Sequence, residues 1–494
     1  MIPLSIFTVN LLSENLLLLA SVLVFVAILV TKVGSKLGAP SLLLFLLLGM
    51  AVGEDGLGLH FADYKLAESI GHFAMTIILF AAGFETSLDE TKPVFKKGVM
   101  LSTVGLLITV ALTGLFIWLI AGKADGFPLM ACFLLAAVMS STDSASVFSV
   151  LRERKLRLKE NLGPLLELES GSNDPIAYML TIALVGYFVE GGAQGHSGWA
   201  IALSGGLLLL LQIVIGLAVG LGMGYAARWV LQRVKLSGAL TSILILSVGF
   251  FTNGIAALLY GNGLLATYVA AIIIGNKVKI ESKRVVLNFF DGFTWLMQLI
   301  MFLMLGLLAR PSHMLPVILP AFLIGLFMML VSRPAGVFLS LLPFKNTSFR
   351  AKTLISWVGL KGAGPILFAL CPIVAGLSRS TEMFNIVFLI TLFSLLFQGS
   401  SLGRVAGWLK LSSTEPQKAE TFGLEVPEEM GMVRDHIVTE EDLVNGPTLR
   451  AIRLPHGIRV MMVRRDGKFL VPHGSMELIP GDHLVIIMGE SDDS

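Results

Sequence analysis

Long apolar runs separated by short polar stretches fill most of the chain. We predict thirteen helices from these runs, at residues 14–32, 40–58, 70–88, 97–121, 127–150, 162–189, 201–231, 238–258, 262–276, 286–308, 314–340, 351–376 and 382–410. Many of the runs approach the ~20 residues with which a helix crosses ~30 Å of hydrocarbon. The pattern therefore predicts an all-α protein that crosses a membrane many times.

The pattern changes after Lys410. Residues 411–422 are polar and are expected to form a linker. Residues 423–494 hold short alternating runs between turn residues, and Asp466-Gly467 is placed for a tight hairpin. We therefore expect a membrane domain at 1–410, the linker, and a small soluble α/β domain at the C-terminus.

The composition agrees with a membrane location. Only 14% of the residues are charged and 55% are hydrophobic, whereas a soluble domain has ~25% charged residues. The two cysteines, Cys132 and Cys371, lie in apolar segments, which excludes a disulfide framework. The net charge of +2 gives no reason to expect nucleic acid as a partner.

The chain lacks several motifs of membrane enzymes. HExxH, a Walker A sequence and paired His-Cys metal spacing are all missing from the sequence. We therefore expect a protein without catalytic residues and without a cofactor.

Basic residues are distributed unevenly among the predicted loops. The loops after odd-numbered helices hold 20 Lys and Arg residues, and those after even-numbered helices hold four. Lys and Arg are retained on the cytoplasmic side of a membrane. This distribution predicts an N-terminus outside and a cytoplasmic C-terminal domain.

Several charged residues lie inside the apolar runs, where each costs ~2.5–3.5 kcal/mol or more and is a functional candidate. They are Glu85, Asp143, Glu167, Glu169, Asp174 and Lys361. Glu85, at the end of its run, is also compatible with a solvated interfacial position. Glu167 fits either a second pairing partner or a residue that faces a cavity.

Two of the predicted helices contain sequences that weaken a helix. Residues 140–146 read SSTDSAS and residues 359–365 read GLKGAGP. The two helices are seven apart in order, so they run in opposite directions, as inverted repeats with paired broken helices would. Asp143 and Lys361 lie at the breaks, where they can neutralise the half-helix ends. Structural compensation alone is the alternative role for both.

The segment 165–180, LLELESGSNDPIAYML, carries most of the candidate chemistry. Helical spacing places Ser170 and Asp174 on one face, and Glu169 and Asn173 on the adjacent face. We expect Glu169 to pair with Lys361, which leaves Asp174 as the titrating group. A buried carboxylate that takes up either a proton or a small cation is sufficient for exchange when access alternates between the two membrane faces.

ELESGSNDP and GLKGAGPILFAL, together with Thr142-Asp143, resemble the NhaP-type cation/proton antiporters of the monovalent cation:proton antiporter-1 group. Within that group the chain resembles the bacterial potassium/proton antiporters of cell-volume regulation. The resemblance covers residues ~10–410. It implies a thirteen-span inverted-repeat fold, a homodimer in the bacterial inner membrane and electroneutral exchange of K⁺ or Na⁺ for H⁺, with K⁺ favoured.

The resemblance also implies roles for single residues. Asp174 would be the carboxylate that holds the cation or the proton. The other ion- and proton-binding residues would be Asn173, Ser170, Thr142 and Asp143. Glu169 and Lys361 would orient the site or compensate charge. Two departures from the family pattern stand out. Lys361 replaces an arginine, and so loses the planar fork. Ala81 replaces an acidic residue, for which Glu85 is a possible substitute.

The C-terminal segment MMVRRDGKFLVPHGSMELIPGDHL resembles the C-terminal regulatory domain of potassium-conductance regulators, known as TrkA-C or RCK-C. The resemblance implies dimerisation and, in some members, a bound nucleotide. A module that serves only dimerisation and stability is the alternative.

Two other transport functions fit the same features. A cation channel gated by the cytoplasmic domain would be expected to show a filter-like loop such as TVGYG, and the sequence has none. A proton-coupled symporter would use the same carboxylate. The choice between K⁺ and Na⁺, the stoichiometry and the direction of transport do not follow from the sequence.

Overall fold

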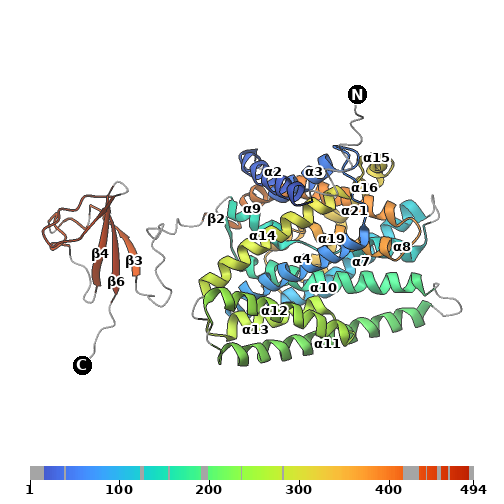
Figure 1. The fold of residues 1–494 in the computed structure, drawn as a ribbon, viewed down its shortest axis with the longest axis horizontal. Coiled ribbons are helices and arrows are strands. Elements are labelled where there is room, and N and C mark those ends of the chain that lie inside the picture. The colour runs from blue at the N-terminus through green and yellow to red at the C-terminus, as the bar shows by residue number, and fades with distance from the viewer. Residues whose placement is uncertain are drawn as a thin grey trace. The chain divides into compact units, whose positions relative to one another are not determined.

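The computed structural model describes residues 16–37, 40–122, 127–153, 156–190, 198–234, 236–280, 283–414, 433–440, 442–444, 446–452, 458–465 and 468–488. The chain divides into two compact units, Met1–Thr414 and Glu415–Ser494. The first unit is a helical bundle, and the described part of the second is built on a β-sheet (Figure 1).

Helices make up almost all of the first unit. They are α2 (Leu16–Leu37), α3 (Ser41–Val52), α4 (Tyr64–Glu85), α5 (Leu88–Thr91), α6 (Phe95–Met100), η1 (Leu101–Gly105), α7 (Leu106–Ile117), η2 (Trp118–Gly122), α8 (Leu129–Val138), α9 (Ser144–Glu153), α10 (Leu162–Val189), α11 (Gly198–Leu231), α12 (Gly238–Leu258), α13 (Gly263–Lys277), α14 (Lys283–Leu307), α15 (Pro311–Met314), η3 (Leu315–Val317), α16 (Ile318–Phe327), η4 (Met328–Ser332), α17 (Arg333–Ser340), α18 (Phe349–Trp357), α19 (Ala363–Phe368), α20 (Leu370–Val374), α21 (Ser380–Ser394), η5 (Leu395–Gly399) and α22 (Ser400–Trp408).

The helical unit has the composition of a membrane domain. Among the described residues, seven helices or continuous helical runs are long and apolar enough to cross a membrane. The predicted all-α membrane fold is confirmed, while the count of thirteen spans remains a prediction.

Both predicted helix interruptions are present. Residues 141–143, between α8 and α9, and residues 359–362, between α18 and α19, lie outside any helix. The two interruptions touch, because the Asp143 N–H donates to the Leu360 carbonyl at 2.9 Å. Each interruption thus satisfies a backbone group that the other leaves without an intrahelical partner.

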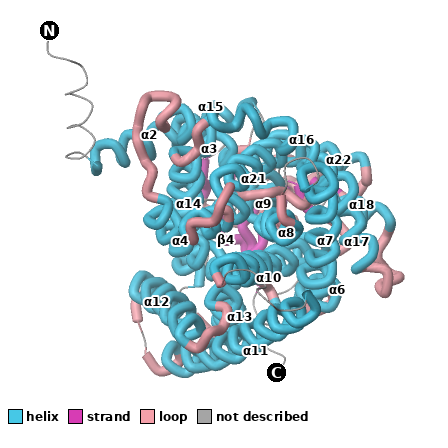
Figure 2. Tube along the Cα trace, turned by 90° about the vertical axis from the view of Figure 1, so that its right-hand side faces the viewer, coloured by secondary structure: helices cyan, strands magenta, loops and turns pink. Residues whose placement is uncertain are grey.

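Helix α10 lies in the interior of the bundle. It contacts α4, α6, α8, α11, α13, α19 and α20, and Figure 2 shows it between the group α11–α13 and the remaining helices. Pro175 lies inside α10 and has no N–H to donate to the preceding turn. The carbonyl of Pro175 accepts a hydrogen bond from Asn262 Nδ2 at 2.9 Å. The helical ladder is therefore weakened directly after Asp174.

A short antiparallel pair ends the helical unit. Strand β1 (Leu156–Leu158) connects α9 to α10, and β2 (Ser412–Thr414) follows the last helix and pairs with it. Lys159 N donates to the Leu411 carbonyl at 2.8 Å, and the Leu411 side chain is buried. The segment predicted as a linker therefore begins as a strand fixed to the bundle.

The second unit is an antiparallel sheet in the order β3-β6-β4-β5. Its strands are β3 (Val433–Ile437), β4 (Ile458–Arg465), β5 (Lys468–Leu470) and β6 (His483–Met488). Arg465 pairs with Lys468, so β4 and β5 flank the predicted Asp466-Gly467 turn, which lies outside the described residues. The described part of this unit shows strands and turns but no helix, so the expected α/β character is seen only in its β part.

Candidate functional site

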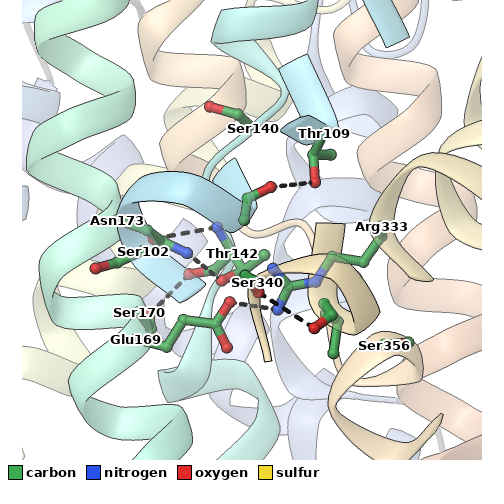
Figure 3. Close-up of polar contacts among 12 residues, drawn as sticks. Ser102, Thr109, Ser140, Thr142, Glu169, Ser170, Asn173, Arg333, Ser340 and Ser356 are labelled. Carbon is green, nitrogen blue, oxygen red and sulfur yellow. Dashed lines mark hydrogen bonds and ion pairs between the residues drawn. The ribbon is translucent and has the colours of Figure 1, made fainter. Parts of the chain in front are cut away.

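The interruption between α8 and α9 binds directly to α10 at Thr142. Ser170 Oγ donates to the Thr142 carbonyl at 2.7 Å. The side-chain amide of Asn173 makes two contacts with Thr142 (Figure 3). Its nitrogen donates to Thr142 Oγ1, and its oxygen accepts from the Thr142 backbone N–H at 3.4 Å. All three residues are buried. An unwound backbone in the bundle interior is thus held by polar side chains one helical turn apart.

Asp174 lies next to this contact. The Ser141 hydroxyl donates to Asp174 Oδ1, and the aspartate is half-buried rather than fully enclosed. Ser141 and Thr142 are adjacent in the interruption, so a carboxylate, hydroxyls and a peptide carbonyl come together at one place. Oxygen donors of these kinds are the ligands that hard cations such as Na⁺ and K⁺ prefer.

Asp143 faces α9 instead. Its carboxylate accepts the Ser146 N–H at 3.1 Å and the Ser146 hydroxyl. This is the geometry of a helix N-cap, where a negative charge stabilises the positive end of the helix dipole. The structure therefore gives Asp143 a partner in its own helix, in agreement with the predicted compensation of a half-helix end.

Lys361 lies in the other interruption and is only 3% exposed. Its Nζ donates to the Ser141 carbonyl at 2.9 Å and lies 3.5 Å from the Ser140 carbonyl. These carbonyls follow the C-terminal end of α8, where a cation is favoured. Lys361 thus neutralises a half-helix end of the opposite break, which is one of the two roles expected of it.

The predicted pairing of Glu169 with Lys361 is wrong. Glu169 Oε1 lies 2.5 Å from Arg333 Nη2, and both side chains are at least nine-tenths buried. Figure 3 shows the two side chains pointing toward each other from α10 and α17. Glu169 faces α17 because it lies on the α10 face adjacent to that of Asp174, whereas Lys361 extends to the carbonyls after α8.

Arg333 is the buried charge that the sequence reasoning overlooked. It lies within the predicted helix 314–340, in the apolar stretch MMLVSRPAGVF. A charge at such a depth meets the same criterion as the six candidates above. The position of Arg333 inside an apolar stretch is visible in the sequence. The sequence does not show, however, whether Arg333 or Lys361 is the partner of Glu169; the tertiary structure shows that it is Arg333.

The two remaining charged candidates, Glu85 and Glu167, lie on α4 and α10. Glu85 is the last residue of α4 and is exposed. The next residue, Thr86, accepts a hydrogen bond from Asn276 at the end of α13. Glu167 is half-buried on α10. Among the described residues, no cluster of three His, Cys, Asp or Glu side chains could hold a metal ion.

Comparisons with known proteins show the family to which the chain belongs. Residues 21–408 match the family described as sodium/hydrogen exchanger, transmembrane, and residues 433–492 match the TrkA-C domain. The K(+)/H(+) antiporter NhaP2 of Shewanella oneidensis is 36% identical over 477 residues, which cover 96% of this chain and 81% of that protein. The K(+)/H(+) antiporter NhaP of Alkalimonas amylolytica is 37% identical over 473 residues, which cover 92% and 78%.

The fold has a counterpart among solved structures. The sodium proton antiporter MjNhaP1 from Methanocaldococcus jannaschii at pH 8 superposes with a TM-score of 0.67 at 22% identity, over 79% of this chain and 97% of that chain. The resemblance drawn from the sequence motifs is confirmed, and the family match identifies a transporter rather than an enzyme. The chain therefore belongs to the transmembrane sodium/hydrogen exchanger family and carries a C-terminal TrkA-C domain.

Proposed function

We propose that this protein exchanges a monovalent cation for a proton by competition at Asp174, and that K⁺ is favoured over Na⁺. The observation that carries the proposal is the convergence of Asp174, Ser170 and Asn173 on the unwound backbone at Ser141 and Thr142. The names of the relatives support it, since two of them are K(+)/H(+) antiporters at 36% and 37% identity.

The hydroxyl groups give this site two states. Ser141 now donates its proton to the Asp174 carboxylate. A hydroxyl can rotate and present a lone pair instead. With a cation bound, Ser141 and Ser170 would turn their oxygens toward the ion beside the Thr142 carbonyl, and Asp174 would supply the negative charge. A proton on Asp174 removes that charge, so proton and cation exclude each other.

The charges around Asp174 make the exchange electroneutral in this proposal. Asp143 compensates the N-terminal end of α9, Lys361 compensates the end of α8, and Glu169 is paired with Arg333. Asp174 is then left to carry either one H⁺ or one monovalent cation. Each exchange moves one positive charge inward and one positive charge outward, so no net charge crosses the membrane.

The remaining features follow the family resemblance. We place the protein in the bacterial inner membrane as a homodimer, with the N-terminus outside and the C-terminal domain in the cytoplasm. A membrane domain at 1–410 acts by alternating access, and the domain at 423–494 regulates it through dimerisation or a bound ligand such as a nucleotide. The uneven distribution of Lys and Arg among the loops supports this orientation.

Transport by the purified protein in proteoliposomes tests the proposal. Na⁺, K⁺, Rb⁺ or Li⁺ gradients should each be compared for their ability to drive a change in internal pH, read with a trapped dye. Asp174→Asn should abolish exchange, because an amide cannot alternate between a proton and a cation. Asp89→Asn, which alters an exposed carboxylate, is the matched control and should transport normally. Normal exchange by a folded Asp174→Asn protein would defeat the assignment.

A further inference from the structure

A cavity with both polar and apolar lining lies beside α10 and is not part of the contact with Thr142. It has a volume of about 290 Å³, is open on one side and is lined by residues of α10 and of the helices α4, α11, α12 and α13, which lie close together in Figures 1 and 2. Its polar lining consists of His72, Tyr178, Gln212, Asn253, Tyr260 and Asn262. The cavity therefore lies on the side of α10 that faces the group α11–α13.

The cavity is near the membrane face opposite the basic loops. Tyr260 lies in the turn between α12 and α13 and is 84% exposed. His72 is in the first half of α4, whose first residues follow an even-numbered predicted loop. Both features place the mouth of the cavity at the predicted outer face, and its floor toward the centre of the bundle.

Tyr178 forms part of the floor. Its ring centroid lies 5.6 Å from that of His72 on α4 and 5.4 Å from that of Phe368, the last residue of α19. Phe368 is 1% exposed. The Tyr178 ring thus lies between α4 and the half-helix that follows the Lys361 interruption.

Asp174 lies just beyond this ring. It precedes Tyr178 by four residues on α10, about one turn or ~6 Å along the helix. Asp174 is not among the residues that line the cavity. Asn262, in the cavity wall, holds the Pro175 carbonyl at 2.9 Å. The cavity lining therefore reaches, at Tyr178, to about one helical turn from Asp174 along α10.

The lining suits a small cation in transit. Amide and hydroxyl groups can replace part of the hydration shell of a monovalent cation, and without a fixed carboxylate they do not hold it tightly. We propose that this cavity is the outer vestibule for the transported cation and that the Tyr178 ring is the gate between the vestibule and Asp174. This inference rests on the proposed exchange at Asp174.

Variants of Tyr178 test the gate. Tyr178→Ala removes the ring and should uncouple transport: an imposed pH gradient across proteoliposomes should collapse several-fold faster than with the wild type when no exchangeable cation is present. Tyr178→Phe keeps the ring and should remain coupled. Tyr187→Ala, on the same helix but beside Phe188, is the matched control and should also remain coupled. Full coupling in Tyr178→Ala would overturn the gate.

Thiol labelling tests the vestibule without relying on transport. In a protein with Cys132 and Cys371 replaced by Ala, Gln212→Cys should react with a charged, membrane-impermeant methanethiosulfonate added from the outer face. Leu211→Cys, the neighbouring position with an exposed apolar side chain outside the cavity, should react much more slowly.

The two experiments separate the inference from the proposed function. Equal rates at positions 211 and 212, or no labelling at Gln212→Cys, would overturn the vestibule even if the wild type exchanges ions. Labelling of Gln212→Cys in the cysteine-free protein, together with a wild type that shows no exchange, would retain the vestibule and reject the exchange at Asp174.

Discussion

At the scale of single residues, the charged groups near the interruptions differ in the kind of partner they have. Glu169 is paired with the guanidinium of Arg333, and Lys361 is bound to backbone carbonyls. Asp174 instead accepts a hydrogen bond from the neutral hydroxyl of Ser141. A carboxylate beside a strong fixed cation would hold a second cation poorly. Asp143 also accepts from neutral groups, but these belong to Ser146 in α9, whereas the partner of Asp174 lies in the interruption itself. This difference supports the proposal that Asp174 is the residue that exchanges ions.

The Glu169–Arg333 pair should be essential for stability. Arg333→Met leaves Glu169, which is 1% exposed, as an unpaired buried carboxylate, and should lower the free energy of unfolding by about 3–5 kcal/mol. Adding Glu169→Gln should recover part of this loss, because a neutral amide is less costly to bury. Thermal unfolding in detergent measures both effects.

A partly exposed ion pair provides the control for this prediction. Arg310 pairs with Glu54, and both side chains are accessible to solvent. Arg310→Met should change the free energy of unfolding by about 1 kcal/mol or less. If Arg333→Met lowered the free energy of unfolding by no more than Arg310→Met does, the prediction that the buried Glu169–Arg333 pair is essential for stability would be wrong.

At the scale of helices, the interruption at residues 359–362 is held by Ser394, the last residue of α21, and by Gln398 in η5. The Lys361 N–H donates to Ser394 Oγ at 2.9 Å, and Ser394 Oγ donates to Gln398 Oε1 at 2.6 Å. Gln398 Nε2 in turn donates to the Trp357 carbonyl at 2.9 Å. Two buried side chains thus satisfy a donor and an acceptor that the break leaves without intrahelical partners.

Removal of this support should destabilise the interruption. Ser394→Ala leaves the buried Lys361 N–H and Gln398 Oε1 without partners, which should cost about 1–3 kcal/mol of unfolding free energy. Ser394→Thr keeps the hydroxyl and should retain most of the stability. Detergent-solubilised protein melted in parallel for the two variants provides the measurement. A Ser394→Ala protein as stable as the wild type would show that the bond to Lys361 contributes nothing.

At the scale of the whole molecule, the helical bundle is followed along the chain by a unit with an antiparallel sheet, which contains a partly buried ion pair of its own. Asp482 is 1% exposed and accepts two hydrogen bonds from Arg465, at 2.9 and 2.7 Å. Arg465 also reaches the Glu477 carbonyl at 2.7 Å. The hydrogen bonds from Arg465 hold the pKa of Asp482 below its usual value of 3.8.

This pKa shift predicts acid sensitivity of the C-terminal sheet. A carboxyl group whose pKa is lower in the folded state stabilises that state fully above its unfolded pKa of about 4, and loses the contribution as the pH falls through the folded value. Strands β4 and β6 should therefore lose hydrogen-exchange protection below about pH 4.

Asp482→Asn supplies the comparison in the full-length protein. Without the titrating carboxyl, the sheet should start less stable at neutral pH and lose less protection on acidification. Hydrogen exchange of residues 458–465 and 483–488 measures this. An identical acid dependence in the two proteins would exclude Asp482 as the origin of the effect.

The sequence by itself determined the membrane class, the positions of both helix interruptions and the segment that carries Ser170, Asn173 and Asp174. These features are local: apolar length fixes a span, and consecutive Ser, Thr and Gly residues weaken the helix in which they lie. The sequence pattern also predicted a β-rich C-terminal unit, because alternation with turn residues is a local signal.

Only the tertiary structure decided which buried charges meet. Helical periodicity places Glu169 on a face of α10, but it does not say whether Arg333 or Lys361 packs against that face. The same holds for Ser394 and Gln398, whose polar groups meet the backbone of a helix more than thirty residues away in sequence. Contacts between residues on different helices depend on how the helices pack against one another. The periodicity within a single segment contains no information about this packing.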